Sequence, residues 1–430
     1  MTDAASAHGT AAPDPSDSVA PSAGGVAGTI PVAGSESADG MFRSLKQYNA
    51  RLYFSSLLVS NIGSWLQLTG TSYLVYRLTG NAADLGYNVA FQFLPMLVLG
   101  TWAGAFADRY DRRTIMIATQ SLMALQAMVL GLLDLTDNVT LPVVWALSLF
   151  LGVVGAMDNP ARRGLITELV PTTQLGNAMS LNTTVMTGSR VFGAALAALL
   201  VVPLGTGWLF ILNGVSYAAM IYGVVGLRTA EMVPAVKRPS GGTPVRDVFR
   251  YVASNRRLSS MFIAYIVVST FAFNYSVVFP KFADVKWGNE DAFGWLLTVT
   301  GIGSVVGSLA TARLQRVSLR WLMFNVGVLG AANIAIAFSQ QLWLAFMLCL
   351  PLGFGGAAMI ASGNAISQQE SPPDMRGRLL ALTAVAFLGS TPIGGPVTGL
   401  IADFVSLEWS LAYGGVSCFV CVAVLAWRWR

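Results

Sequence analysis

The sequence predicts an all-α membrane protein whose twelve transmembrane helices form two pseudo-symmetric six-helix halves. Of its 430 residues, 54% are hydrophobic and only 11% are charged, and the mean hydropathy is +0.61. A soluble domain carries roughly 25% charged residues because water must wet its surface. Lipid must therefore cover much of this chain. Recurring apolar runs and an internal repeat then divide it into helices and halves.

Charge-free segments recur along the chain, each about as long as the roughly 20 residues that a membrane-spanning helix needs. Two longer apolar stretches, 169–227 and 321–369, are broken near their middles and each predict two more spans. Backbone polarity excludes lipid-exposed spans that are not helical, and the segments are too long for barrel strands. The single segments are 52–76, 85–107, 114–133, 138–157, 258–280, 292–312, 379–402 and 409–427.

The composition also divides the chain into regions. Residues 1–42 are rich in Ala, Pro, Ser and Gly, contain no Lys or Arg, and predict a disordered cytoplasmic tail rather than a signal peptide. Residues 229–256 combine proline, glycine and basic residues, which predicts a cytoplasmic linker. The two six-helix bundles are then expected at 43–228 and 257–430.

The positive charges predict the orientation in the membrane. With both termini in the cytoplasm, 22 of the 26 Lys and Arg residues fall on the inner side, and Arg190 lies inside a span. Short loops rich in Lys and Arg stay on the cytoplasmic side. We therefore expect a multi-pass protein of the cytoplasmic (plasma) membrane with both termini cytoplasmic. The same loops account for the pI of 9.2 without a nucleic-acid partner.

An internal repeat relates the two halves. A shift of 201 residues places the fourth and fifth predicted spans on the tenth and eleventh without a gap. Matched glycines and prolines indicate shared backbone requirements rather than shared apolarity. Two related halves predict a cavity between them and alternating access by rocking. The matched pairs include Gly152 with Gly353, Gly155 with Gly356, Pro171 with Pro372, Gly188 with Gly389, and Gly193 with Gly394.

A charged motif lies between the second and third predicted spans. It begins at Gly104, continues with Asp108 and Arg109, and ends with Arg112 and Arg113, in the pattern G-x-x-x-D-R-x-x-R-R. This pattern resembles the signature loop of the major facilitator superfamily. The resemblance implies a conformational latch that holds the outward-open state and in which Gly104 permits close helix packing. From the residues alone, a basic inner loop with incidental acids is the alternative.

More of the chain, from about residue 42 to the C-terminus, is similar to one branch of that superfamily, the exporters that include the enterobactin exporter and macrolide efflux proteins. The similarity lies in residues 75–80, 93–95, 107–113, 158–162 and 178–193. Antiporters of the superfamily have helix-packing glycines in the fifth and eleventh spans, although Ala194 stands here where the branch has proline. The glycines and proline expected to pack helices are Gly188, Gly193, Gly389, Gly395, Pro396 and Gly399.

Two charged residues are candidates for coupling or substrate binding. Arg190 is the one charge deep in a predicted span, where a charge costs about 2.5–3.5 kcal/mol on insertion scales. It either faces the cavity and binds an anionic group, or is a structural residue capped by neighbours such as Asn182 and Ser189. Asp158 is expected at the inner end of the fourth span, where Asn159-Pro160 would stop the helix. It either pairs with nearby arginines or carries the coupled proton.

Polar side chains also occur inside predicted spans, and in lipid they should face protein or water. They line a central cavity for an amphipathic substrate, or they form hydrogen bonds between packed helices. The sequence leaves both interpretations open. The candidate cavity-lining residues are Asn61, Ser64, Gln67, Gln92, Asn182, Asn274 and Tyr275.

The leading functional prediction is a secondary active transporter that exports small amphipathic molecules, such as drugs or siderophore-like metabolites, with proton coupling. The alternative is an importer or permease on the same fold. A polytopic membrane enzyme would need clustered Asp, His or Cys at membrane depth, which the sequence lacks. We expect no catalytic residues, metal or cofactor. The expected partners are the lipid bilayer, a small-molecule substrate and protons, and the chain is expected to act as a monomer.

Overall fold

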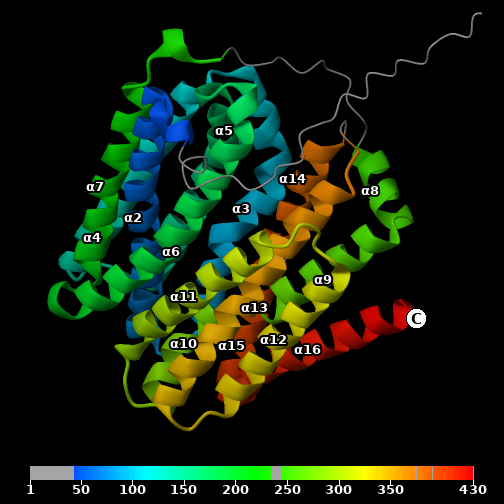
Figure 1. Cartoon of the computed structure of the whole chain (residues 1–430). Helices are drawn as coiled ribbons and strands as arrows, with labels where there is room; N and C mark the ends of the chain where they lie inside the picture. Colours follow the sequence, from blue (N-terminus) through cyan, green and yellow to red (C-terminus); the bar gives the residue numbers. More distant parts are fainter. Residues whose placement is uncertain (1–42, 234–244, 373–374, 390, 430) are drawn as a thin grey trace, which may run out of the picture.

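The computed structural model describes residues 43–233, 245–372, 375–389 and 391–429, and the regular structure within these ranges is helical (Figure 1). The predicted all-α membrane fold is confirmed. The expected tail at 1–42 and part of the expected linker lie outside the described residues. The proposed boundaries between the two bundles therefore stay a prediction.

Six long helices form the first half. They lie at α2 (Tyr48–Thr79), α3 (Ala82–Arg109), α4 (Arg112–Leu135), α5 (Leu141–Leu169), α6 (Leu175–Leu204) and α7 (Thr206–Val225). The second half begins after the short helix α8 (Val245–Ser254). Its helices are α9 (Arg256–Phe271), α10 (Tyr275–Lys281), α11 (Ala292–Ala312), α12 (Leu319–Phe338), α13 (Leu342–Gln369), α14 (Arg376–Leu388), α15 (Thr391–Phe404) and α16 (Leu407–Arg428).

Eleven helical stretches in the described part of the chain are long and apolar enough to cross a membrane. Two of them join shorter helices: α9 and α10 belong to one stretch from Arg256 to Lys286, and α14 runs into α15. The twelfth span is α2, which has 32 residues but carries a series of polar side chains along its length. A helix with polar groups in lipid needs protein neighbours for them.

Side-chain caps define several helix starts. Asp111 accepts a hydrogen bond from the backbone N–H of Thr114 and caps α4, while Asn255 accepts from two backbone N–H groups of α9. Ser318 and Ser406 cap α12 and α16 in the same way. The first N–H groups of a helix have no partner within it, so these side chains supply one.

The α5 helix corrects one expectation. Asn159-Pro160 does not stop it: Pro160 lies inside α5, which continues to Leu169. Proline removes one backbone hydrogen bond, and neighbouring polar side chains can satisfy the freed carbonyls in a membrane helix. The carbonyl that Pro160 leaves without its helical partner is that of Ala156; next to it, the Asn159 side chain donates to the carbonyl of Gly155 at 2.9 Å. Asp158 therefore lies well inside a helix and not at its end.

The repeated glycines lie at equivalent helix contacts in the two halves. A Cβ at Gly152 of α5 would lie 2.2 Å from the Gln92 carbonyl of α3, and one at Gly353 of α13 would lie 1.8 Å from the Thr300 carbonyl of α11. Likewise Gly193 of α6 abuts α2, and Gly394 of α15 abuts α9. Each glycine lets two backbones approach to a distance that a side chain would prevent.

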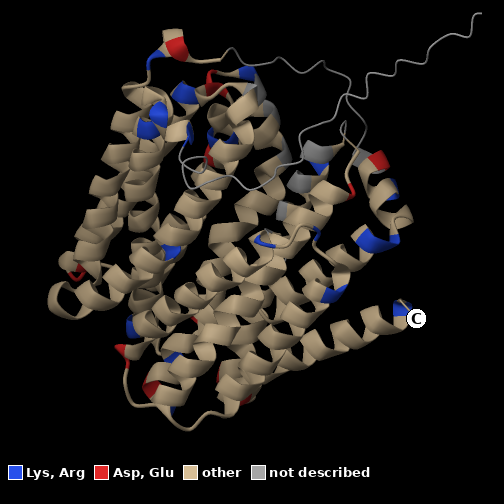
Figure 2. Ribbon diagram, viewed as in Figure 1, with Lys and Arg blue, Asp and Glu red and all other residues tan. Residues whose placement is uncertain are grey.

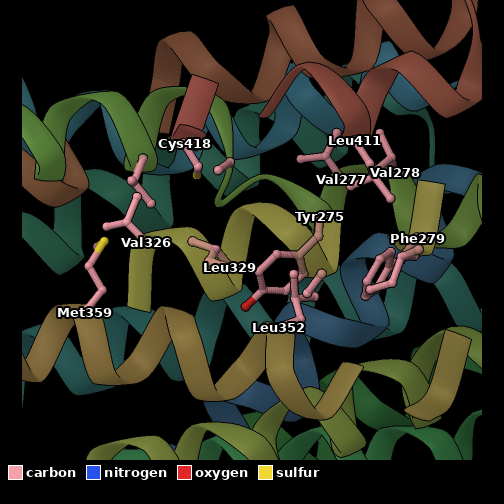
Figure 3. Close-up of a cluster of buried hydrophobic side chains, with 14 of the residues drawn as sticks. Tyr275, Val277, Val278, Phe279, Val326, Leu329, Leu352, Met359, Leu411 and Cys418 are labelled. Atoms are coloured by element: carbon pink, nitrogen blue, oxygen red, sulfur yellow. The ribbon is translucent and has the colours of Figure 1, made fainter. Parts of the chain in front are cut away.

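The core of the second half is apolar and continuous (Figure 3). Leu329, Leu352 and Met359 are fully buried there together with Cys418. Cys418 and Cys421 are free thiols within α16. A Cβ at Gly330 would meet the Cβ of Cys418 at 2.7 Å, so this cysteine packs α16 against α12.

Two ends of the bundle are distinguished below. The linker side is the end where α2 begins and where α8 lies, at the top of Figure 1, and the far side is the opposite end. Many of the basic residues in Figure 2 lie toward the linker side, while the middle of the bundle is largely uncharged.

Candidate transport site between the two halves

The two halves are joined at the far side by a carboxylate from α15. Asp403 accepts hydrogen bonds from the backbone N–H groups of Ala82 and Ala83, at 3.0 and 2.7 Å, at the start of α3. Lys281 of α10 forms an ion pair with the same carboxylate at 2.6 Å. A carboxylate satisfies the unpaired N–H groups of a helix N-terminus and complements its partial positive charge. Asp403 thus caps a helix of the opposite half.

Further contacts continue this closure. The Tyr76 hydroxyl donates to a carboxylate oxygen of Asp284 at 2.6 Å, joining α2 to the second half. Three residues earlier on the same helix, the Tyr73 hydroxyl accepts a hydrogen bond from the Gly294 backbone N–H at 2.9 Å. These groups come from helices of opposite halves, so they hold the far-side ends together.

Glycines bring the backbones of α3 and α15 into contact along the same side. A Cβ at Gly86 would lie 2.4 Å from the Gly395 carbonyl and 2.8 Å from the Cα of Pro396. One at Gly399 would lie 2.4 Å from the Ala82 carbonyl. Nearer the middle of the membrane, a Cβ at Gly389 would lie 2.9 Å from a side-chain carbon of Leu97 on α3. The close approach therefore extends from the far-side ends to about mid-depth.

Arg190 lies at this interface near the middle of α6. Its guanidinium donates a hydrogen bond to the hydroxyl of Tyr275, which belongs to the other half. It also lies over the indole ring of Trp65, 5.2 Å from the ring centroid, in a cation–π contact. Neither partner is an acid, and Arg190 has no carboxylate partner among the described side chains. Its positive charge is therefore not compensated by any described carboxylate.

The neighbours first considered as caps for Arg190 do not bond to it. The side-chain oxygens of Asn182 and Ser189 are buried, and within the described part of the chain neither has a hydrogen-bond partner. Buried polar atoms are nearly always paired, so an unpaired one needs an explanation. Asn182 lies on α6, the same helix as Arg190, so α6 carries both an unpaired acceptor and an uncompensated charge.

Two other expected cavity residues lie near Arg190. Tyr275 is buried beside the break between α9 and α10, and Asn274 donates to the Thr270 carbonyl at 2.7 Å across that break. Asn274 therefore satisfies a carbonyl that the interrupted helix leaves free. Gln92 lies on α3, where its backbone carbonyl contacts Gly152.

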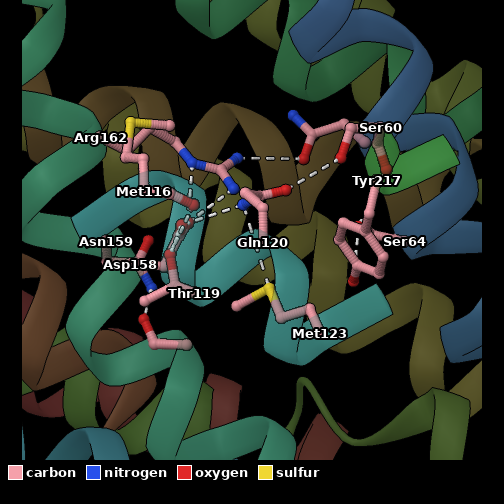
Figure 4. Close-up of polar contacts among 12 residues, drawn as sticks. Ser60, Ser64, Met116, Thr119, Gln120, Met123, Asp158, Asn159, Arg162 and Tyr217 are labelled. Atoms are coloured by element: carbon pink, nitrogen blue, oxygen red, sulfur yellow. Dashed lines mark hydrogen bonds and ion pairs between the residues drawn. The ribbon is translucent and has the colours of Figure 1, made fainter. Parts of the chain in front are cut away.

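A second polar cluster surrounds Asp158 inside the first half (Figure 4). One carboxylate oxygen accepts hydrogen bonds from Thr119 at 2.8 Å and Gln120 at 2.9 Å, both on α4. The other accepts two from Arg162, at 3.0 and 2.7 Å. The Asp158 side chain is 3% exposed. Such a carboxylate is held by four donors, and its charge is matched by Arg162.

The Asp158 cluster extends to α2. Arg162 donates a long hydrogen bond to the side-chain oxygen of Asn61 at 3.4 Å, and Asn61 contacts the sulfur of Met186 on α6. Ser60 donates to Gln120 at 3.5 Å. The cluster therefore connects α2, α4, α5 and α6 within one half.

The polar series on α2 fits the second of the two interpretations, hydrogen bonds between packed helices. Gln67 is buried and bonds to Gln126 of α4 and Asn213 of α7, while Ser64 contacts the hydroxyl of Tyr217 on α7. These partners all belong to the first half, so Ser64 and Gln67 make hydrogen bonds between packed helices. The reason is orientation: this face of α2 turns toward α4 and α7, and not toward the second half.

The motif expected to act as a latch lies at the linker side. Arg112 pairs with Glu168 of α5 at 2.6 Å, and Arg113 donates to the Val224 and Val225 carbonyls at the end of α7. Arg109 is the last residue of α3, and the side chain of Asp108 lies outside the described ones. Arg112 and Arg113 therefore brace helices within one half.

Asp111, between these arginines, is ionised more readily than an ordinary aspartate. Partial burial favours its neutral form, but hydrogen bonds from the Thr114 hydroxyl and backbone N–H, and the nearby charge of Arg113, outweigh burial. They lower the pKa of Asp111. This acid caps α4.

Two expected packing glycines have no close neighbour. A Cβ at Gly104 or at Gly188 would meet no described heavy atom within 4 Å. Both lie toward the linker side or mid-depth, away from the closely packed far-side ends. The expected close packing there is therefore absent from this conformation, because close approach at a given glycine depends on which ends of the halves meet.

Sequence reasoning missed several residues of these clusters. Gln120 is a polar residue within an otherwise apolar run, a signal that could have identified it. Trp65 shows no such signal, since an aromatic residue is ordinary in a membrane helix. Asp403 and Lys281 are 122 residues apart, and one sequence holds no information that they pair.

Known proteins resemble this chain over nearly its whole length. The staphyloferrin A transporter of Staphylococcus aureus is 21% identical over 387 residues, which cover 87% of this chain and 94% of the relative. Macrolide efflux protein A of Streptococcus pyogenes is 25% identical over 389 residues, covering 86% and 92%. One is named a transporter and the other an efflux protein.

The fold has solved counterparts as well. The crystal structure of a bacterial homolog to the human lysosomal transporter Spinster, in an inward-facing and occupied conformation, superposes with a TM-score of 0.64 at 15% identity. The superposition covers 91% of this chain and 96% of that one. Residues 40–429 match the transmembrane secretion effector family. The chain therefore belongs to this family of major facilitator superfamily transporters.

Proposed function

We propose that this transporter exports small amphipathic molecules that carry an anionic group, by alternating access coupled to protons. The observation that carries the proposal is Arg190, a cation at mid-depth that touches both halves and has no described carboxylate partner. An unmatched charge inside a membrane protein is costly and is kept where it binds a substrate or moves between partners. Trp65 and Tyr275 supply flat apolar surface beside it.

The unpaired oxygen of Asn182 supports the same location for the substrate. It lies on α6 with Arg190, so one helix offers a guanidinium donor and an amide acceptor. An amphipathic solute with a carboxylate and a hydroxyl or amine would satisfy both. The name of one relative, a staphyloferrin A transporter, is consistent with a substrate of that kind.

Asp158 is our candidate for the coupled proton. It is a buried carboxylate inside a membrane helix, and it accepts four hydrogen bonds, two of them from Arg162. If helix movements within the first half took Arg162 away from Asp158, the carboxylate would lose its charge partner, and protonation would replace the lost positive charge. Proton binding would then depend on conformation, which is the requirement for coupling.

Alternating access would use the contacts already described. In our proposal the linker side faces the cytoplasm, since its loops are rich in basic residues, and both termini lie there. The far side is closed by Asp403 and the glycines of α3 and α15. Closing the linker side would bring Gly104, Asp108, Arg109 and the rest of the motif against the second half. The motif would then act as the latch of the opposite state.

The export test measures accumulation of a macrolide and of a ferric siderophore in a deletion strain that carries the wild-type gene or a variant. Wild type should lower accumulation, and an uncoupler should abolish the difference. Arg190→Gln should lose export of the anionic siderophore, while Arg163→Gln, a neutralised exposed arginine on α5, should behave as wild type. Lower accumulation in the deletion strain would show import instead. An uncoupler without effect would exclude proton coupling.

A further inference from the structure

An apolar groove runs along the outer surface of the second half, between α9 and α16. Its volume is about 490 Å³ and its lining is almost wholly apolar. Ile263, Val267 and Phe271 from α9 face Val416, Val420 and Val424 from α16. Val420 is 56% exposed, so the groove opens outward to the side where lipid surrounds the protein. Figure 1 shows α16 at the edge of the bundle.

Basic and aromatic side chains lie at the linker-side end of the same pair of helices. Arg428, at the end of α16, donates to the Ser259 hydroxyl of α9 at 3.0 Å. The Trp429 indole donates to Ser260 at 3.0 Å, and the guanidinium of Arg256 lies 5.2 Å from the Trp429 ring centroid. Neither arginine has an acidic partner among the described residues.

The arginines and the groove are continuous. The two helices run in opposite directions, and Ser259 contacts Arg428 one turn before Ile263 and Val424 line the groove. Deeper in the membrane, the rings of Phe271 and Tyr413 are 6.1 Å apart, so the helices still contact there. A molecule with a charged end at the arginines would therefore extend directly along the apolar groove.

We propose that this seam binds one anionic phospholipid, with its phosphate between Arg256 and Arg428 and its acyl chains along the groove. Guanidinium groups recognise phosphate through charge-assisted hydrogen bonds, and indole rings favour the headgroup region of a membrane. Basic pockets between membrane helices on the cytoplasmic side are a known mode of lipid binding. The groove requires acyl chains, so a free phosphate does not fill the site.

The binding test uses the purified full chain in mild detergent with phosphatidylglycerol or with phosphatidylcholine of the same acyl chains, and counts retained lipid by native mass spectrometry. Wild type should retain phosphatidylglycerol preferentially. The double variant Arg256→Gln and Arg428→Gln should bind it on the order of tenfold more weakly, because two cations near the headgroup are lost. The matched pair Arg313→Gln and Arg316→Gln removes two exposed charges from the loop after α11 and should bind as wild type.

A second arm tests the groove without changing charge. Val420→Trp fills it and should reduce retention of phosphatidylglycerol, while Val306→Trp, at a similarly exposed valine on α11, should not. Millimolar inorganic phosphate should not displace the lipid. The proposal is overturned if the Arg313/Arg316 double variant loses as much phosphatidylglycerol as the Arg256/Arg428 double variant. It is also overturned if Val420→Trp leaves lipid retention unchanged, or if phosphate displaces the lipid. A wild-type dimer that Val420→Trp dissociates would overturn it as well, since a second copy would then occupy the groove.

Discussion

Replacing Asp158 by asparagine should destabilise the protein strongly, because it leaves Arg162 charged and unpaired in the helix bundle. The two side chains are isosteric, so no cavity forms. Asparagine, however, has one acceptor oxygen where aspartate offers two, and its amide nitrogen is a donor. It can accept from Thr119 and Gln120, or from Arg162, but not from both sides.

The magnitude follows from the burial of the pair. The Asp158 side chain is 3% exposed and that of Arg162 is 14% exposed. Removing one partner of a buried ion pair costs about 3–5 kcal/mol, because the remaining charge is uncompensated. If the new asparagine accepts from Thr119 and Gln120, the 3.4 Å hydrogen bond to Asn61 is the one described bond that Arg162 keeps. We therefore expect Asp158→Asn to lower the free energy of unfolding by about 3 kcal/mol or more.

The measurement is a double-mutant cycle on equilibrium unfolding in mixed micelles, followed by tryptophan fluorescence. Adding Arg162→Met should restore at least about 2 kcal/mol, since replacing a whole buried pair by apolar groups is often neutral. Asp137→Asn, at an exposed loop position, is the control and should change little. The reasoning is refuted if Asp158→Asn costs less than about 1 kcal/mol, or costs the same with Met at 162.

Two further predictions concern the helix contacts. Gly353→Ala places a Cβ against a backbone oxygen of α11 and should lower the free energy of unfolding by about 1–3 kcal/mol. Gly188→Ala, where a Cβ meets no described atom within 4 Å, should leave the free energy of unfolding unchanged. Equal effects of the two substitutions would contradict the packing argument. Asp403→Ala removes the cap on α3 and leaves Lys281 without its ion-pair partner Asp403, so the far side should open more often. A cysteine placed at Val201, which lines a far-side pocket, should then react faster with an impermeant maleimide; an unchanged rate would show that Asp403 does not hold the far side closed.

The helices could be predicted from the sequence because membrane thickness dictates the length of each apolar run. The prediction went wrong at Pro160, where a rule for helices in water was applied to a helix in lipid. There, Asn159 bonds a carbonyl of the preceding turn, and breaking the helix would expose polar backbone to lipid. Because the predicted helix ended at Asp158, the burial of this carboxylate inside a span was also missed.

The site was only partly predictable. The importance of Arg190 follows from its own depth, because a charge in a span is expensive wherever its partners lie. Its partners, Trp65 and Tyr275, depend on how the halves pack, which a single sequence does not determine. The same limit applies to Gly104 and Gly188, since a glycine shows where two backbones can meet but not in which conformation they do.

The cap that Asp403 places on α3 has an electrostatic consequence for the opened far side. Lys281 and Asp403 belong to the same half, so they would move together and stay neutral as a pair. The start of α3 would lose its carboxylate and face water with about half a positive charge from its helix dipole. The mouth of the open transporter would thus be positive on one wall only. Added salt would screen the attraction between the Asp403 carboxylate and the N-terminus of α3, which favours closure. The balance between the two conformations should therefore vary with ionic strength.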